Sequence, residues 1–340
     1  MAISDFARAV ERGINRIGLR RTASAGWVPR VSGFSGYGSP RRMRVLGRVL
    51  MTNPASESDS LQARGWRQFL TIQVGDLPLV ISFGGPDGPR FETVTDGNGY
   101  VDVLIDDHGL PPGWHEVTIS GEGVVSASAE VLIVDSSARF GVISDIDDTV
   151  LVTWLPRALV AAWNSWIRHT NTRKPVPGMA DFYAEILRDH PNAPVFYLST
   201  GAWNTFDALK AFLSSHGFPE GPMLLTDWGP TQTGLFRSGQ EHKKVQLRNL
   251  IIEYPEMRWL LIGDDGQHDP LIYGEAANEH PDRIAGLAIR RLSSGEHVLS
   301  HGTTGALVEA RRTGDAIFGR DGYELLRAYR SSPFGSRPDA

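Results

Sequence analysis

The segment from Phe140 to Thr149 (FGVISDIDDT) constrains the fold of this chain more than any other stretch. Its apolar residues predict a buried β-strand that runs directly into Asp145, Asp147 and Asp148. Like charges a few ångströms apart at the end of a buried strand repel strongly unless a cation lies between them. Hard divalent cations such as Mg²⁺ bind carboxylate and phosphate oxygens. The segment therefore indicates metal-assisted phosphoryl chemistry, with an acidic turn after a strand as the alternative interpretation.

The spacing of these acids excludes a calcium-binding EF-hand loop. Such a loop needs Gly at its sixth position and Glu at its twelfth. The sequence has Val150 and Pro156 at those positions.

Two further apolar runs, 194–198 and 258–262, also end in polar residues. These residues are Ser199, Thr200 and Gly201 after the first run, and Asp264, Asp265 and Asp269 after the second. A helical stretch between the two runs carries Lys243 and Lys244. In open parallel sheets, ligands bind outside the carboxyl ends of the strands. We therefore expect these groups to converge at one edge of a sheet.

The order of these motifs resembles the haloacid dehalogenase superfamily of phosphatases. Longer strings are similar to the phosphatidate phosphatase family typified by the fungal actin patch protein, which is itself similar to the catalytic domain of lipins. The strings are Ser144–Thr149, Pro177–Met179, Tyr197–Asn204, Asp227–Gly229, His242–Lys243 and Gly263–Pro270. The resemblance covers about residues 139–292. Asp265 departs from the pattern, which usually has a small hydroxyl residue there, and Ala202 stands where Pro is common.

The resemblance implies a Mg²⁺-dependent phosphatase that converts phosphatidate to diacylglycerol and phosphate. It implies that Asp145 is the nucleophile, which forms an aspartyl-phosphate, and that Asp147 is the general acid and base. Alternation along an extended segment also predicts that these two side chains share one side, with Asp148 pointing the other way as a structural cap. Thr149 would fix Asp145 or the turn by a hydrogen bond.

The remaining groups are expected to bind the phosphoryl group and the metal. Ser199 would donate a hydrogen bond to a phosphoryl oxygen, and Thr200 and Gly201 would present backbone N–H groups at a helix N-terminus. Lys243 would neutralise the phosphoryl charge and hold the nucleophile ionised, with Lys244 as the fallback. The expected metal ligands are Asp145, Asp147, Asp264 and Asp269. Asp265 competes with Asp264 for the ligand role, and Asp269 has a second interpretation as the residue that orients Lys243.

The chain of 340 residues is long enough for two domains. Residues 1–42 are predicted to be a basic amphipathic helix, over 1–21, followed by a linker. Residues 43–138 contain short apolar or alternating runs separated by turn signals, which predict an immunoglobulin-like β-sandwich. The predicted strands are 43–51, 67–74, 77–82, 90–94, 100–105, 115–120 and 124–134. Residues 139–325 alternate strands with helices, which predicts a Rossmann-like parallel-sheet haloacid dehalogenase domain. The helices are predicted near 155–170, 179–189, 203–215, 241–253 and 269–279. Only about fifty residues separate its first two motifs, which leaves room for a small cap or none, and residues 326–340 are predicted to be a loose tail.

The composition limits the classes of partner and the cellular location that we expect for this chain. A formal net charge of −5 argues against a general nucleic-acid binder. The absence of cysteine excludes disulfides and a thiolate nucleophile. No apolar run approaches the ~18 residues of a membrane span, and charged residues interrupt the start of the chain where a signal peptide would be apolar. We expect a cytoplasmic protein, and the basic helix leaves open a peripheral contact with an anionic membrane at its inner face.

The sequence leaves two alternative functions open. One is a phosphatase for soluble phosphomonoesters or phosphoproteins. The other is a non-catalytic lipid-binding module, which is disfavoured because Asp145 and Asp147 are both present.

Overall fold

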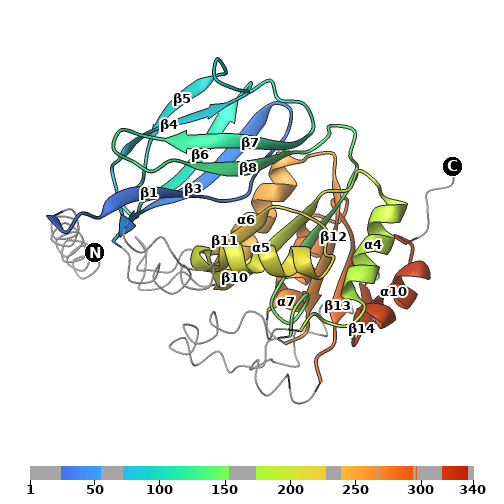
Figure 1. Cartoon of the computed structure of the whole chain (residues 1–340). Coiled ribbons are helices and arrows are strands. Elements are labelled where there is room, and N and C mark those ends of the chain that lie inside the picture. Colours follow the sequence, from blue (N-terminus) through green and yellow to red (C-terminus); the bar gives the residue numbers. More distant parts are fainter. Residues whose placement is uncertain are drawn as a thin grey trace, which may run out of the picture. The chain divides into compact units, whose positions relative to one another are not determined.

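The computed structural model describes residues 24–54, 72–152, 174–226, 239–266, 268–293, 296 and 316–335. The chain divides into two compact units between Ser136 and Ser137, two residues before the boundary that the sequence suggested. The helices expected over 1–21 and 155–170, the string Asp227–Gly229 and most of the strand expected at 67–74 lie outside the described residues. Figure 1 shows the elements of both units in the order of the chain.

The first unit contains an eight-stranded sheet with the order β1-β3-β2-β8-β7-β4-β5, and β6 pairs with β3. Its strands are β1 (Val28–Gly33), β2 (Gly36–Gly38), β3 (Arg42–Thr52), β4 (Pro78–Phe83), β5 (Arg90–Val94), β6 (Tyr100–Asp106), β7 (Gly113–Ser120) and β8 (Ala127–Ile133). Buried and exposed residues alternate along β4 and β8, as the sequence pattern indicated. The immunoglobulin-like topology stays a prediction.

The prediction that residues 22–42 form a linker is wrong for 28–38, which contain β1 and β2. The glycines there allow strands to approach closely and do not mark a flexible segment. A Cβ on Gly36 would lie 2.2 Å from the carbonyl oxygen of Arg44, and one on Gly38 would lie 2.4 Å from that of Arg42. β2 is fully buried, so its Gly-Tyr-Gly sequence belongs to the packed sheet.

The second unit is an α/β domain built on a six-stranded sheet with the order β11-β10-β9-β12-β13-β14. All of its paired strands are parallel. The strands are β9 (Phe140–Asp145), β10 (Val195–Ala202), β11 (Met223–Thr226), β12 (Arg258–Asp264), β13 (Ile284–Arg290) and β14 (Ala316–Gly319). The central strands β9 and β12 are almost entirely buried, as expected for a parallel sheet covered on both faces.

Helices cover this sheet (Figure 1). They are α4 (Met179–Asp189), the 3₁₀ turn η4 (Trp203–Thr205), α5 (Phe206–Ser215), α6 (Gly239–Glu253), α7 (Asp269–Glu279) and α10 (Gly322–Arg330). α4 packs against α10, and α6 packs against α7. The sequence pattern predicted the two ends of α4 and α7 at the residues where the structure has them. The parallel α/β class is confirmed.

The prediction of a loose tail from residue 326 is wrong for residues 326–335. Strand β14 and helix α10 continue the domain, and Leu325, Tyr329 and Phe334 are buried. The N-terminus of α10 docks on the turn before α4, where Gly322 donates its backbone N–H to the carbonyl of Pro177 at 2.8 Å. The Gly and Ser residues near the end of the chain led us to overlook the short amphipathic helix α10.

Replacing Leu325 by Ala tests whether α10 is part of the folded core. Loss of a fully buried leucine should lower the free energy of unfolding by about 2–5 kcal/mol, because it removes apolar contacts and leaves a cavity. Arg327→Ala, at an exposed position of the same helix, should change it by less than about 0.5 kcal/mol. Urea denaturation of both variants measures this difference. Equal changes in the free energy of unfolding would show that α10 is not part of the folded core.

Candidate active site

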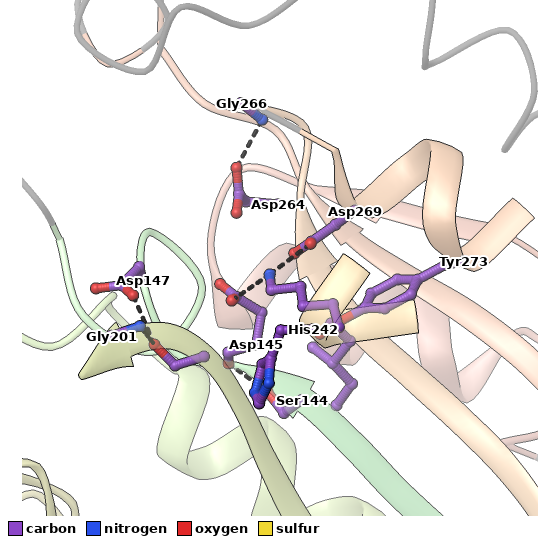
Figure 2. A network of polar contacts seen from close by, with 12 residues as sticks. Ser144, Asp145, Asp147, Gly201, His242, Asp264, Gly266, Asp269 and Tyr273 are labelled. Atoms are coloured by element: carbon purple, nitrogen blue, oxygen red, sulfur yellow. Dashed lines mark hydrogen bonds and ion pairs between the residues drawn. The ribbon is translucent and has the colours of Figure 1, made fainter. Parts of the chain in front are cut away.

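The acidic strand ends converge at one edge of the parallel sheet. β9 lies between β10 and β12, and the three strands run in the same direction. Asp145 and Asp264 are the last residues of β9 and β12, and Ser199 lies in β10. All three side chains are at most 5% exposed. The expected convergence of these groups is therefore what the fold produces (Figure 2).

Lys243 connects two of the carboxylates. Its Nζ lies 2.6 Å from Oδ1 of Asp145 and 2.6 Å from Oδ1 of Asp269. Although burial lowers the pKa of Lys243, the two carboxylates raise it above its ordinary value. Lys244, the fallback from the sequence, instead pairs with Glu275 on the surface. The neighbouring His242 is buried and its Nε2 lies 3.3 Å from the carbonyl oxygen of Leu224, so it ties α6 to β11.

Asp145, Asp264 and Asp269 form an acidic cluster. One ligand oxygen from each lies within 4.8 Å of the others. Oδ2 of Asp145 and Oδ2 of Asp269 are buried and have no hydrogen-bond partner among the residues that the structure describes. Burial raises the pKa of Asp145, with Lys243 opposing and Asp269 and Asp147 adding to the shift. Burial, followed by the charges of Asp269 and Asp145, raises the pKa of Asp264 well above its ordinary value. A divalent cation would relieve both the repulsion and the unmet oxygens, so this donor set fits Mg²⁺.

Asp269 reaches this cluster because Gly263 leaves room for it. Asp269 is the first residue of α7, where the helix dipole favours a negative charge. A Cβ on Gly263 would lie 2.6 Å from Oδ2 of Asp269 and 2.7 Å from the ring of Tyr273. Asp269 thus pairs with Lys243 and also belongs to the acidic cluster, so the two roles that the sequence left open are compatible.

Asp265 does not belong to the cluster, although the sequence made it a competitor of Asp264. Its Oδ1 accepts a hydrogen bond from the backbone N–H of Leu292 at 2.8 Å. The carboxylate of Asp264 instead accepts from the backbone N–H of Gly266 at 2.6 Å and lies with Asp145 and Asp269. Adjacent residues at a strand end point to opposite sides, which explains why only one of the pair reaches the others.

Asp147 lies apart from the acidic cluster, on the side of β10 (Figure 2). Its Oδ2 accepts a hydrogen bond from Oγ of Ser199 at 2.9 Å. Among the described residues its carboxylate is not in the group close enough to share one ion. The expectation that the Asp147 side chain is a metal ligand is therefore not supported by this geometry, because its Oδ2 is bonded to Ser199 and the carboxylate lies outside the acidic cluster.

Three expected hydrogen-bonding roles differ in the structure. Oγ of Ser199 donates to Asp147 and accepts from the backbone N–H of Gly201 at 2.9 Å, so that N–H is already used. Thr200 and Gly201 lie inside β10 and not at a helix N-terminus, because the strand extends to Ala202 before η4 begins.

Oγ1 of Thr149 is buried with no hydrogen-bond partner in the described part of the chain. Its turn is held by backbone bonds to the carbonyl of Ile146 instead.

Two supporting residues were missed at the sequence level. The Thr226 hydroxyl contacts the carbonyl oxygens of Thr200 and Gly201 at 2.8 and 3.2 Å, which fixes the end of β10. The hydroxyl of Tyr183 in α4 is hydrogen-bonded to Oγ of Ser144, directly before the nucleophile candidate. Both residues sit in apolar runs that are typical of a protein core, so no local pattern marked them.

Comparison with known proteins identifies the domain that carries these residues. Residues 140–291 match the family described as phosphatidate phosphatase APP1, catalytic domain. This segment, which is less than half of the chain, is similar to that family. The match contains every member of the acidic cluster and Lys243.

Two curated relatives support the same assignment. Phosphatidate phosphatase APP1 of Saccharomyces cerevisiae is 25% identical over 250 residues, which is 70% of this chain and 42% of that protein. An uncharacterized protein of Schizosaccharomyces pombe is 26% identical over 167 residues, which is 49% of this chain and 27% of that protein. The chain thus spans less than half the length of either relative.

Two solved structures show distant likeness to this chain. The HAD domain of the effector Lem4 from Legionella pneumophila has a TM-score of 0.30 and 18% identity, and covers 46% of this chain and 88% of its own. DsGPDH of Dunaliella salina has a TM-score of 0.35 and 14% identity, and covers 55% of this chain and 35% of its own. Similarity at this level carries no further conclusion.

Magnesium should stabilise the folded protein through the acidic cluster. A cation that binds only the native state raises its stability by mass action, so saturating Mg²⁺ should raise the melting temperature by about 5 °C. Asp264→Asn should lose most of this gain without lowering the melting temperature of the metal-free protein, because it also removes like-charge repulsion. Thermal unfolding with and without Mg²⁺ measures both effects.

Asp265→Asn is the matched control. It makes the same chemical change one residue away and keeps an oxygen that can accept from Leu292. Its Mg²⁺ response should equal that of the unmodified protein. A lost response in Asp265→Asn with a normal response in Asp264→Asn would reverse the ligand assignment.

Proposed function

We propose that this chain is a Mg²⁺-dependent phosphatase of the haloacid dehalogenase type that hydrolyses phosphatidate to diacylglycerol and phosphate through an aspartyl-phosphate on Asp145. The observation that carries the proposal is the state of the Asp145 carboxylate. One of its oxygens is paired with Lys243, and the other is buried without a hydrogen-bond partner among the described residues. An oriented carboxylate with a free oxygen is what nucleophilic attack on phosphorus requires.

The residues around Asp145 divide the remaining work. Lys243 favours the ionised form of Asp145 against the effect of burial and offers positive charge near the equatorial phosphoryl oxygens. Asp147, held by Ser199, protonates the leaving oxygen and later takes a proton from the water that hydrolyses the aspartyl-phosphate. Because Asp147 lies outside the acidic cluster, its carboxylate remains available for proton transfer. Separate positions for the acid and the nucleophile support this division of roles.

Asp145, Asp264 and Asp269 are the residues that would hold Mg²⁺. The bound ion would supply positive charge that compensates the charge on the phosphoryl oxygens. Asp269 also fixes Lys243, so a change at this residue should affect both the ion and the lysine.

Phosphatidate is proposed as the substrate because the matching family and the yeast relative carry that name. No helix among the described residues is long and apolar enough to cross a membrane. Peripheral contact through the basic segment 1–21, which lies outside the described residues, remains a proposal that is consistent with an anionic lipid substrate.

Phosphate release from phosphatidate in mixed micelles tests the proposal. We expect turnover that requires Mg²⁺ and that Asp145→Asn lowers by more than about 10³-fold, because the substitution removes the nucleophile. A soluble aryl phosphate assayed in parallel separates the lipid phosphatase from a phosphatase for small esters. Comparable kcat/KM values for the two substrates would favour the second function.

The control for this experiment is again Asp265→Asn, whose carboxylate contacts Leu292 and not the acidic cluster. It should keep most of the turnover. Activity that persists in Asp145→Asn would contradict the aspartyl-phosphate mechanism, whichever substrate is hydrolysed.

A further inference from the structure

Arg290, the last residue of β13, is a buried cation outside the acidic cluster and is 5% exposed. Its Nη1 donates to the carbonyl oxygen of Asp148 at 2.7 Å, and its Nε donates to that of Arg320 at 3.2 Å. Its Nη2 pairs with Oε1 of Glu296 at 2.7 Å. A planar guanidinium presents its donors in a fixed geometry, so it can hold several acceptors at once. Arg290 therefore joins three segments that are far apart in the sequence.

The backbone around Arg290 joins a fourth segment. The carbonyl of Arg290 accepts from the backbone N–H of Asp265 at 2.9 Å, and the N–H of Leu292 donates to the Asp265 carboxylate at 2.8 Å. Asp265 directly follows Asp264, which is a member of the acidic cluster. The end of β13 is thus bonded to the loop after β9, which carries Asp147, and to the residue that directly follows Asp264 at the end of β12.

The contact with Asp148 falls on an unusual piece of backbone. Asp148 has a φ of 59°, in the left-handed region that residues with a Cβ rarely adopt. It lies one residue after Asp147 and three after Asp145, so its conformation determines how the loop leaves the sheet. A charged donor on its carbonyl oxygen stabilises this conformation.

We propose that Arg290 is a positioning residue for the loop from Asp145 to Thr149. By holding the carbonyl of Asp148, and by tying β13 to Asp265, it sets where Asp145 and Asp147 lie relative to Asp264. The backbone of Arg290 pairs with that of Asp264 across β12 and β13, whereas its side chain bonds to Asp148, Arg320 and Glu296 and to no carboxylate of the acidic cluster among the described residues. The inference rests on the proposed phosphatase function for its kinetic part, and on the acidic cluster alone for its metal-binding part.

Arg283 provides a matched control at the opposite end of the same strand. It immediately precedes β13, and its Nη2 donates to the carbonyl oxygen of Tyr254 at 2.6 Å. It is partly buried and likewise holds a backbone carbonyl. A purely structural role for such arginines predicts similar effects at the two ends, whereas positioning predicts an effect on activity only at Arg290.

The experiment compares Arg290→Lys with Arg283→Lys in the full chain. Lysine keeps the positive charge beside Glu296 but cannot span three acceptors with one ammonium group. Arg290→Lys should lower kcat on phosphatidate about 10–100-fold, the usual effect of losing a residue that supports catalytic ligands. KM should stay within about threefold, because Arg290 touches no substrate. The Mg²⁺ concentration at the midpoint of the thermal shift should rise about tenfold, and Arg283→Lys should leave kcat and this midpoint within about twofold.

Equal losses of kcat in the two variants, or an unchanged kcat and Mg²⁺ midpoint in Arg290→Lys, would overturn the inference. If the unmodified protein shows a Mg²⁺ shift but no phosphatase activity, the proposed function fails and the midpoints alone decide the positioning role. If the unmodified protein shows no Mg²⁺ shift, the positioning role fails with the metal site. Should Arg290→Lys not fold, Glu296→Gln decides, because it loosens the guanidinium while keeping an acceptor. A kcat at least threefold lower supports the role, and an unchanged kcat overturns it.

Discussion

The proposed chemistry of the second unit depends on three buried carboxylates that the fold holds close together beside one ammonium group. Asp145, Asp264 and Asp269 lie within ligand distance of one another, and Lys243 pairs with two of them. Lys243 compensates only part of this charge, as the raised pKa values of Asp145 and Asp264 indicate. Such an arrangement costs free energy in a buried environment unless a further cation is bound. These carboxylates lie at the carboxyl ends of the sheet strands, where ligands bind in parallel α/β domains.

The surrounding structure serves to hold these charges in place. Gly263 makes room for Asp269, the hydroxyl of Tyr183 bonds to Ser144 beneath the nucleophile candidate, and Arg290 holds the carbonyl of Asp148. None of these residues is part of the acidic cluster. Gly263 leaves the space that Asp269 occupies, whereas the bonds of Tyr183 and Arg290 restrain the end of β9 and the loop after it. Positioning groups from several strands and helices thus allow a strained group of charges to persist.

Sequence patterns predicted the features that depend on neighbouring residues. Continuous apolar runs located the parallel strands. The residues at the ends of these strands, together with a lysine on the intervening helix, predicted the convergence of Asp145, Asp264 and Lys243. Patterns failed where the outcome depends on distant partners. The choice between Asp264 and Asp265 depends on Leu292, and the linker that became β2 depends on its fit against β3. No local signal specifies such contacts, because they arise only when the strands are assembled.

A crystal structure of the protein with Mg²⁺ and beryllium fluoride would be the most decisive measurement, because it locates the ion and the reactive carboxylate together. We expect a beryllium fluoride adduct on the free oxygen of Asp145, with the ion bound by Asp145, Asp264 and Asp269 and the Lys243 ammonium beside the adduct. An ion bound at other residues, or an adduct on a residue other than Asp145, would contradict the proposed roles of the acidic cluster and the nucleophile.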